Sequence, residues 1–199
     1  MLGIRLRWIL LVLVLFGTWR YFSSGEVQAG PGQIAPGEPI QNRASPSAPI
    51  HLGDYRLEPL ANFEIEARVL RTENYRLGRE AELSPLDFAL GWGAMSDSAV
   101  LAELSISQGG RFYYYQWQNE PPIPAHEIAT QSANMHLIPA NADIEARLKA
   151  VRIGQVVRIR GQLVEARARD GWIWRSSLTR NDTGAGACEL IRVESLSIR

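Results

Sequence analysis

The stretch that decides the fold runs from Gly154 to Ser177 and reads "GQVVRIRGQLVEARARDGWIWRSS". From Val157 to Leu163 every second residue is apolar or glycine, and this period of two predicts a half-buried β-strand. After Leu163 the apolar positions move by one residue, as they do at a β-bulge. We therefore expect a long, bulged strand that bends sharply, as the strands of a small barrel must.

The residues on either side of this strand complete a local unit. Asp170-Gly171 is a two-residue hairpin turn, so Ile173 and the neighbouring tryptophans should return along the same sheet. Upstream, Asn141 can cap a helix that extends to about Val151, because apolar residues recur there at helical spacing. A last strand is expected from about Cys188 to Ile198.

The first half of the chain predicts further short elements. The segment 62–71, "NFEIEARVLR", alternates as a half-buried strand does. Ser84-Pro85-Leu86-Asp87 is typical of a helix start, and a second short helix is expected near Ser96. The segment 104–118, "LSISQGGRFYYYQWQ", predicts a hairpin that turns at Gly109-Gly110.

The order of these elements predicts a mainly β fold with short helices. With "VRIGQVVRIRGQLVEA" at 151–166, it resembles the oligonucleotide/oligosaccharide-binding (OB) fold. That fold is a five-stranded barrel with a helix between its third and fourth strands. We therefore expect a small OB-like barrel, or a curved antiparallel sheet, preceded by an N-terminal membrane helix. The insert from Arg76 to Met95 has no obvious place in the minimal fold.

Two further segments carry a second resemblance. "SPLDFALGWGAMSD" (84–97) and "WRSSLTRNDTGAGACE" (174–189) look like segments of an uncharacterised family of bacterial single-pass exported proteins. This resemblance covers most of residues 60–196 and brings no known activity.

The N-terminus, "MLGIRLRWILLVLVLFGTWRYF", places two arginines before an apolar or small run from Trp8 to Trp19. As a helix the run spans about 18 Å, against roughly 30 Å for a bilayer core. Residues 2–22 are long enough if the arginines snorkel and the tryptophans lie at the interface. We expect a signal anchor in the cytoplasmic membrane, with the rest of the chain extracytoplasmic (periplasmic). The alternative is secretion to the periplasm after signal cleavage near Ala29.

The chain therefore divides into three parts. Residues 1–22 form the anchor or signal segment, residues 23–51 a Pro/Gly-rich disordered linker, and residues 52–199 an extracytoplasmic β-rich domain. Because the chain contains only one cysteine, this domain has no internal disulfide, and its hydrophobic core must stabilise it.

The charge of the chain is balanced overall but uneven along its length. The formal net charge is zero, which argues against a protein built to hold polyanions. The segment 54–103 contains ten acidic residues and five arginines, whereas 147–180 contains nine basic residues and two acidic ones. The basic half includes arginines beside tryptophans, a combination that binds single-stranded nucleic acid in some barrels. It also suits a peptide or glycan ligand. The ligand-binding candidates are Arg158, Arg160, Trp172, Trp174, Arg180, Asp182 and Thr183.

The segment 180–189, "RNDTGAGACE", contains the Asp-Thr-Gly-Ala of aspartic proteases at Asp182. An aspartic protease needs an apolar strand before this loop and a second aspartate to share a proton. No apolar strand precedes Asp182, and no second Asp-Thr/Ser-Gly is present. The sequence therefore favours a polar turn at the rim of the sheet, where ligand contacts are common.

The only cysteine, Cys188, begins an apolar strand, so a core position is favoured over a nucleophile with His136 or His126 as its base. The three histidines and Cys188 show no spacing typical of a metal site, and no cofactor motif is present.

We therefore expect a non-catalytic, membrane-tethered binding or assembly module of the cell envelope, with an envelope protein, a peptide or a glycan as its partner. One alternative is an envelope hydrolase that uses Asp182, His136 and Cys188. The other is single-stranded nucleic-acid binding through the basic aromatic hairpin.

Overall fold

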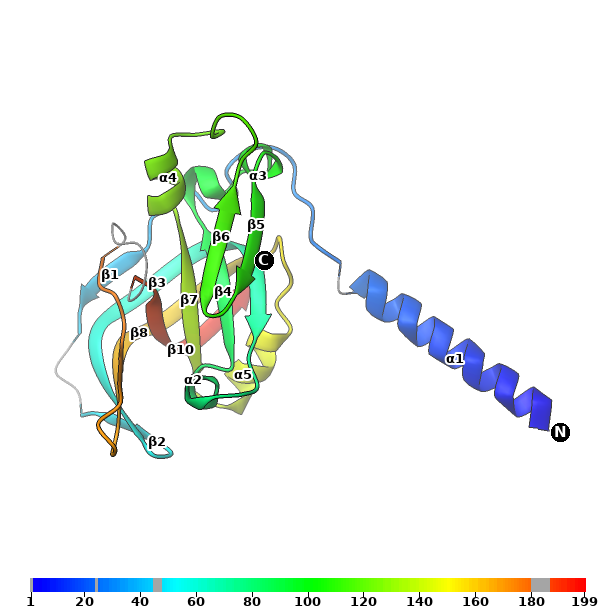
Figure 1. The fold of residues 1–199 in the computed structure, drawn as a ribbon, viewed down its shortest axis with the longest axis horizontal. Helices are drawn as coiled ribbons and strands as arrows, with labels where there is room; N and C mark the ends of the chain where they lie inside the picture. Colours follow the sequence, from blue (N-terminus) through cyan, green and yellow to red (C-terminus); the bar gives the residue numbers. More distant parts are fainter. Residues whose placement is uncertain (1, 24, 45–47, 180–186) are drawn as a thin grey trace.

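The computed structural model describes residues 2–23, 25–44, 48–179 and 187–199. A 22-residue helix, α1 (Leu2–Ser23), lies apart from a β-rich domain that contains all the strands (Figure 1). The class predicted from the sequence, mainly β with short helices, is confirmed.

Five strands make the centre of the domain: β3 (Tyr55–Asn74), β4 (Leu86–Gly91), β7 (Ser132–Pro139), β8 (Val156–Ala168) and β10 (Glu189–Ile198). Along the sheet their order is β3, β4, β7, β10, β8, and β8 also pairs with β3. The pair β7–β10 is parallel, whereas the other four pairs are antiparallel. These pairings make a curved sheet whose concave side encloses the largest apolar cluster.

One helix closes the lower side of this core. Helix α5 (Ala142–Lys149) contributes the buried side chains Ile144 and Leu148, and Val151 follows it into the same cluster. Its cap is the predicted one, because the Asn141 side chain accepts a hydrogen bond from the Ile144 amide at 2.9 Å. The helix lies between β7 and β8 in the chain and packs against β7 and β10.

The bulge predicted in 154–177 lies on the neighbouring strand instead. Across from Leu163 and Val164, the register of β3 shifts between Pro59 and Ala61, so Leu60 is the extra residue. In β8 the change of apolar phase has another cause. Leu163 packs into the central cluster, whereas Val164 packs into a second cluster with Leu57 and Leu190, so both faces of the strand are buried there.

The predicted helix start at Ser84-Pro85-Leu86-Asp87 is wrong. Leu86 begins strand β4, whose six residues are all buried: Leu86, Phe88 and Leu90 face the central cluster, and Ala89 faces the cluster under the β5–β6 segment. A strand covered on both faces shows no alternation, so its apolar run could not be distinguished from a short helix. The local helix, α2 (Arg79–Leu83), comes earlier. Near Ser96 a 3-10 turn, η1 (Gly93–Ser96), precedes α3 (Ser98–Ala102).

The predicted hairpin is present, but its turn lies one residue later than expected. Strands β5 (Ser105–Gly109) and β6 (Phe112–Gln116) pair with Gly109 opposite Phe112, which leaves Gly110 and Arg111 in the turn. Both turn residues have positive φ, as a two-residue hairpin turn of type I′ requires. The hairpin forms a separate two-stranded sheet in front of β4 and β7, below the short helix α4 (Ala125–Thr130) (Figure 1).

Part of the segment expected to be a disordered linker packs against the domain. Strands β1 (Ile40–Arg43) and β2 (Ile50–Leu52) both pair with β3, and Ala35 is fully buried. The Val27 amide also donates to the Ile153 carbonyl at 2.8 Å. The linker sequence shows no periodic apolar residues, so it gave no sign of packing. The contacts that it makes are mostly backbone hydrogen bonds, which leave no pattern in the sequence.

Within the described part of the chain, no helix combines the length and the apolar character that crossing a membrane requires.

Candidate functional site

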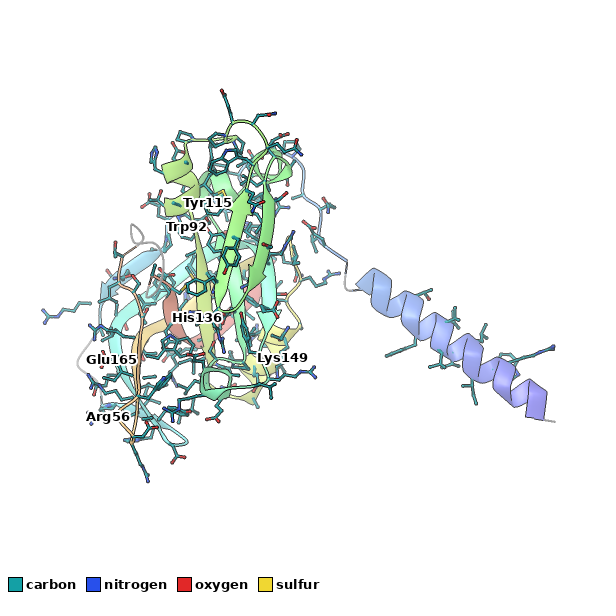
Figure 2. The ribbon with its side chains drawn as sticks, in the orientation of Figure 1. Arg56, Trp92, Tyr115, His136, Lys149 and Glu165 are labelled. Carbon is teal, nitrogen blue, oxygen red and sulfur yellow. The ribbon has the colours of Figure 1, made fainter. Side chains whose placement is uncertain are left out.

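A pocket of about 310 Å³ opens where five parts of the chain meet: the tip of the β5–β6 hairpin, α2, β7, strand β9 (Ile173–Arg175) and the residues just before β10. Figure 2 places His136 beside the hairpin tip. The residues that line the pocket are Glu80, Gly110, Arg111, Phe112, His136, Trp174, Arg175 and Cys188.

Arg111 occupies the hairpin turn with a φ of 72°, and it is the one non-glycine residue with positive φ in the described chain. Such a backbone is uncommon for an arginine and persists only where side-chain contacts hold it. Its guanidinium donates to Asp87 Oδ1 at 2.7 Å and to the Ser84 carbonyl at 3.0 Å. It also lies over the Tyr75 ring, 3.7 Å from the centroid. These contacts fix the hairpin tip to the face of β4.

Asp87 is the centre of a buried polar cluster. Its side chain is fully buried, and Arg111 is its strongest partner. The Asn134 amide donates to Oδ2 at 3.4 Å, and His136 Nδ1 lies 2.9 Å from the same oxygen. A buried carboxylate is tolerated only where cations and donors surround it, so these three partners hold Asp87 in place.

His136 connects this cluster to the pocket. Its ring is almost fully buried in β7 and lies 4.9 Å, centroid to centroid, from the ring of Trp174. Nδ1 lies 2.9 Å from Asp87 Oδ2 and makes no hydrogen bond to the described residues, so the two atoms form a close polar contact. With Nδ1 directed at Asp87, Nε2 is the nitrogen left for the pocket.

Tyr75 stays protonated in this cluster. Burial raises the pKa of its phenol to about 12, and the backbone hydrogen bond from Arg111 opposes that rise. The phenol oxygen accepts this bond from the Arg111 amide at 3.0 Å. Tyr75 therefore supports the turn and offers no proton chemistry near neutral pH.

Cys188 lies at the pocket and not in the apolar core that the sequence favoured. Its exposure is intermediate, and its Sγ lies 3.8 Å from the Arg111 carbonyl oxygen. The strand begins one residue later, at Glu189, so the thiol precedes the buried part of the strand. The sequence could not place it, because the apolar residues that follow Cys188 made the whole segment look buried.

The predicted basic aromatic surface is divided in the structure. Arg158 and Arg160 both bind Glu64, with Arg160 Nε 2.9 Å from Glu64 Oε2. Hydrogen bonds from Arg160 and then Arg158 hold the pKa of Glu64 below its usual range. These two arginines lie away from the pocket and share one carboxylate.

The tryptophans of the predicted surface lie on the other side of the hairpin turn at Asp170. Trp174 faces the pocket, whereas Trp172 packs edge-on against Tyr55 at 5.8 Å and lies below the Arg79 guanidinium at 5.5 Å. Next to them, Arg175 pairs with the buried Glu165, whose pKa is lowered mainly by that hydrogen bond. The remaining candidates Arg180, Asp182 and Thr183 lie outside the described residues.

The residues that the sequence analysis missed are Tyr75, Asp87, Arg111 and Asn134. Asp87 was assigned to a helix start and Arg111 to a strand, so neither was recognised as buried and polar. The one available signal was Asp87 itself, a charged residue inside the apolar run "LDFALG".

Among the described residues, no group of three or more histidine, cysteine, aspartate or glutamate side chains is placed to hold a metal ion. Comparisons with models of protein families, with curated proteins and with solved structures found no match.

Proposed function

We propose that this chain is a membrane-tethered, extracytoplasmic binding module of the bacterial cell envelope, built on an OB-type barrel. Its ligand is a peptide or a glycan, and it binds in the pocket between the hairpin tip, β9 and the start of β10. The observation that carries the proposal is this pocket, which is lined by the Trp174 ring and by charged side chains.

The OB assignment rests on the order of the strands. Numbered along the chain, β3, β4, β7, β8 and β10 are strands one to five, and α5 lies between the third and the fourth. The first strand pairs with both the second and the fourth, and the third and fifth pair in parallel. This agrees with a five-stranded Greek-key barrel of OB type. The insert that had no place in the minimal fold supplies α2 and the second strand.

The place of the pocket fits this assignment. OB folds bind their ligands on the face of strands two and three, between the loop that joins strands one and two and the loop that joins strands four and five. Here His136 comes from strand three, Glu80 from the first of these loops, and Trp174 from the second. Side chains of the hairpin β5–β6, among them Tyr113 and Tyr115, pack in one cluster with Ala89 of strand two. This argument is an analogy at the level of the fold.

The chemistry of the pocket favours a peptide or a glycan over nucleic acid. A stacking ring beside both acidic and basic groups suits ligands with hydroxyl and amide groups. A nucleic-acid groove needs uncompensated arginines along the backbone path. Arg158 and Arg160 share Glu64, and Arg175 shares Glu165 with Arg167, so these arginines already bind carboxylates.

The membrane tether rests on the N-terminal sequence and on the exposure of α1. The described apolar side chains from Trp8 to Phe16 are 47% to 63% exposed, so they need an apolar environment that the domain does not supply. Retention of this segment is supported by Gly154. A Cβ at Gly154 would lie 2.0 Å from the Val27 carbonyl oxygen, so the backbone near residue 27 packs tightly on the domain. Cleavage near Ala29 would remove that contact.

Titration with peptide and glycan fragments of the cell wall tests the binding function. Amide chemical-shift changes should gather on the lining residues, and Trp174→Ala should abolish them. Tyr114→Ala is the matched control, because Tyr114 is an exposed aromatic residue of the β5–β6 hairpin that does not line the pocket. Shift changes that spread evenly, or that survive Trp174→Ala, would contradict the proposal.

Fractionation of the full chain tests the tether. We expect the protein in the membrane fraction after an alkaline wash, with the domain accessible to protease from the periplasmic side. Recovery in the soluble fraction with an N-terminus near residue 30 would establish cleavage instead.

A further inference from the structure

The pocket also brings together a thiol, an imidazole and a buried carboxylate that the proposed binding function does not require. Cys188 and His136 line the same cavity, and His136 Nδ1 lies 2.9 Å from Asp87 Oδ2. They come from the approach to β10, from β7 and from β4, so only the folded chain assembles them.

We propose that Cys188 is a reactive thiol whose proton is taken by His136, and that the site forms a mixed disulfide with a sulfur–sulfur bond of a small molecule or a partner protein. This inference rests on the same pocket as the proposed function.

Two features of the structure and one general property of cysteines carry the proposal. First, Cys188 is partly exposed at a cavity of about 310 Å³, so a disulfide can reach the sulfur. Second, the side chain of His136 is 95% buried, lines the same cavity and has its Nδ1 2.9 Å from Asp87 Oδ2, so we assign Nε2 as the proton acceptor. Third, reactive cysteines lie near bases or positive charge, since the thiolate is the nucleophile.

The positive charge in the pocket contributes less than the imidazole does. Arg111 and Arg175 both line the cavity, but Asp87 and Glu165 neutralise them. His136 is therefore the group that we expect to set the reactivity of the thiol. Asp87 acts through His136 as a positioning residue.

The exchange balances without an external oxidant. Cys188 Sγ loses its proton to His136 Nε2 and attacks one sulfur of the disulfide. A new bond joins Sγ to that sulfur as the original sulfur–sulfur bond breaks, and the leaving sulfur takes the proton from the imidazolium. Cys188 is oxidised to the mixed disulfide, and the other half of the reagent is reduced to a thiol.

The chemistry favours a disulfide over an acyl substrate for a structural reason. Thiol–disulfide exchange requires a thiolate, access and a leaving sulfur. Acyl transfer requires in addition a pair of donors aimed at the developing oxyanion. The described groups around the pocket supply a partly exposed thiol and an imidazole, which are the protein's share of the first set.

The test measures the rate at which the full chain, in mild detergent, reacts with the aromatic disulfide DTNB between pH 5 and pH 10. An ordinary thiol gives a midpoint near about 8.5. We expect a midpoint at least about one unit lower, and therefore a rate at pH 7 roughly tenfold above that of the unfolded chain. A midpoint at or above 8.5 in the folded protein would overturn the proposal.

Variants test whether His136 acts as the base and distinguish that role from an effect on folding. His136→Gln should lower the rate at pH 7 about tenfold and return the midpoint toward 8.5, and Asp87→Asn should shift it in the same direction. His126→Gln is the matched control, because His126 is exposed on α4, away from the pocket. An unchanged rate in a folded His136→Gln protein would refute the role of His136.

Two further measurements define the substrate and keep the two proposals apart. Glutathione disulfide and a cysteine-peptide disulfide distinguish a small-molecule source from a protein source, and formation of either mixed disulfide, seen by mass spectrometry, supports the proposal. Repeated turnover of p-nitrophenyl acetate would contradict the proposal, because it would show that the site acts on an acyl substrate and not on a disulfide. Cys188→Ser should keep the binding of peptide or glycan fragments, so a failed thiol reaction leaves the binding function testable.

Discussion

The Arg111–Asp87 pair gives the sharpest prediction about stability. Replacing Arg111 by methionine keeps most of the apolar stem and removes the charge. The Asp87 side chain, which is 0% exposed, would then lose the guanidinium that lies 2.7 Å from its Oδ1. The Ser84 carbonyl would lose a donor at the same time.

The expected cost follows from burial. Removing one partner of a buried ion pair costs about 3–5 kcal/mol, because the remaining charge stays in a medium that solvates it poorly. Asn134 and His136 still face Asp87, so we expect the lower end, about 3 kcal/mol. That is a large part of the roughly 5–15 kcal/mol by which domains are stable.

The assay is urea-induced unfolding of the full chain in mild detergent, followed by tryptophan fluorescence. Two further variants identify the cause of any loss. Arg111→Gly removes the same charge but relieves the left-handed backbone, so it should be about 1 kcal/mol less destabilising than Arg111→Met. The double variant Asp87→Asn with Arg111→Met should recover part of the loss, since no buried charge is left without its partner.

A loss below about 1 kcal/mol for Arg111→Met would refute this reasoning, because that is the range of an exposed ion pair. Equal losses for the methionine and glycine variants would show that the positive φ stores no strain.

Three other changes test separate parts of the fold. Gly161→Ala should destabilise the domain by about 1–3 kcal/mol in the same assay, because its Cβ would lie 2.0 Å from the Arg192 carbonyl oxygen, whereas Gly109→Ala should have little effect. Asn141→Ala should cost about 1 kcal/mol through the lost cap of α5, measured by thermal unfolding. Glu165→Gln should cost about 1 kcal/mol at pH 7. Since the pKa of Glu165 lies below its ordinary 4.5 in the folded state, its contribution is present above pH 4.5 and is lost as the pH falls through the folded value. The variant should therefore lose less stability than the parent protein on acidification.

Much of the sheet could be predicted because its signals are local. The alternation in β3, the cap at Asn141 and the hairpin around Asp170-Gly171 each depend on residues that are neighbours in the sequence, although the loop of that hairpin holds three residues, Arg169 to Gly171, and not the predicted two. The prediction was wrong at β4 because burial on both faces removes the alternation. It misplaced the bulge because a shift of phase in β8 looks the same whether an extra residue is inserted or the second face is covered.

Only some residues of the candidate site could be predicted from the sequence, for a related reason. Trp174 was selected as an aromatic residue among arginines, and His136 and Cys188 were kept as an alternative pair. Asp87 and Arg111 are 24 residues apart, and each is unremarkable in its own segment. Their pairing depends on the hairpin folding back over β4.

The sequence by itself determined the mainly β class, the capped helix α5 before the long strand β8, and the position of the apolar N-terminal run that follows two arginines. Each of these follows from spacing or composition along the chain. Only the tertiary structure decided that Cys188 leaves the core, that Arg158 and Arg160 share Glu64, and that one pocket gathers Arg111, His136 and Trp174. Those outcomes depend on strand order and register, which bring distant residues together through pairings that short-range patterns do not encode.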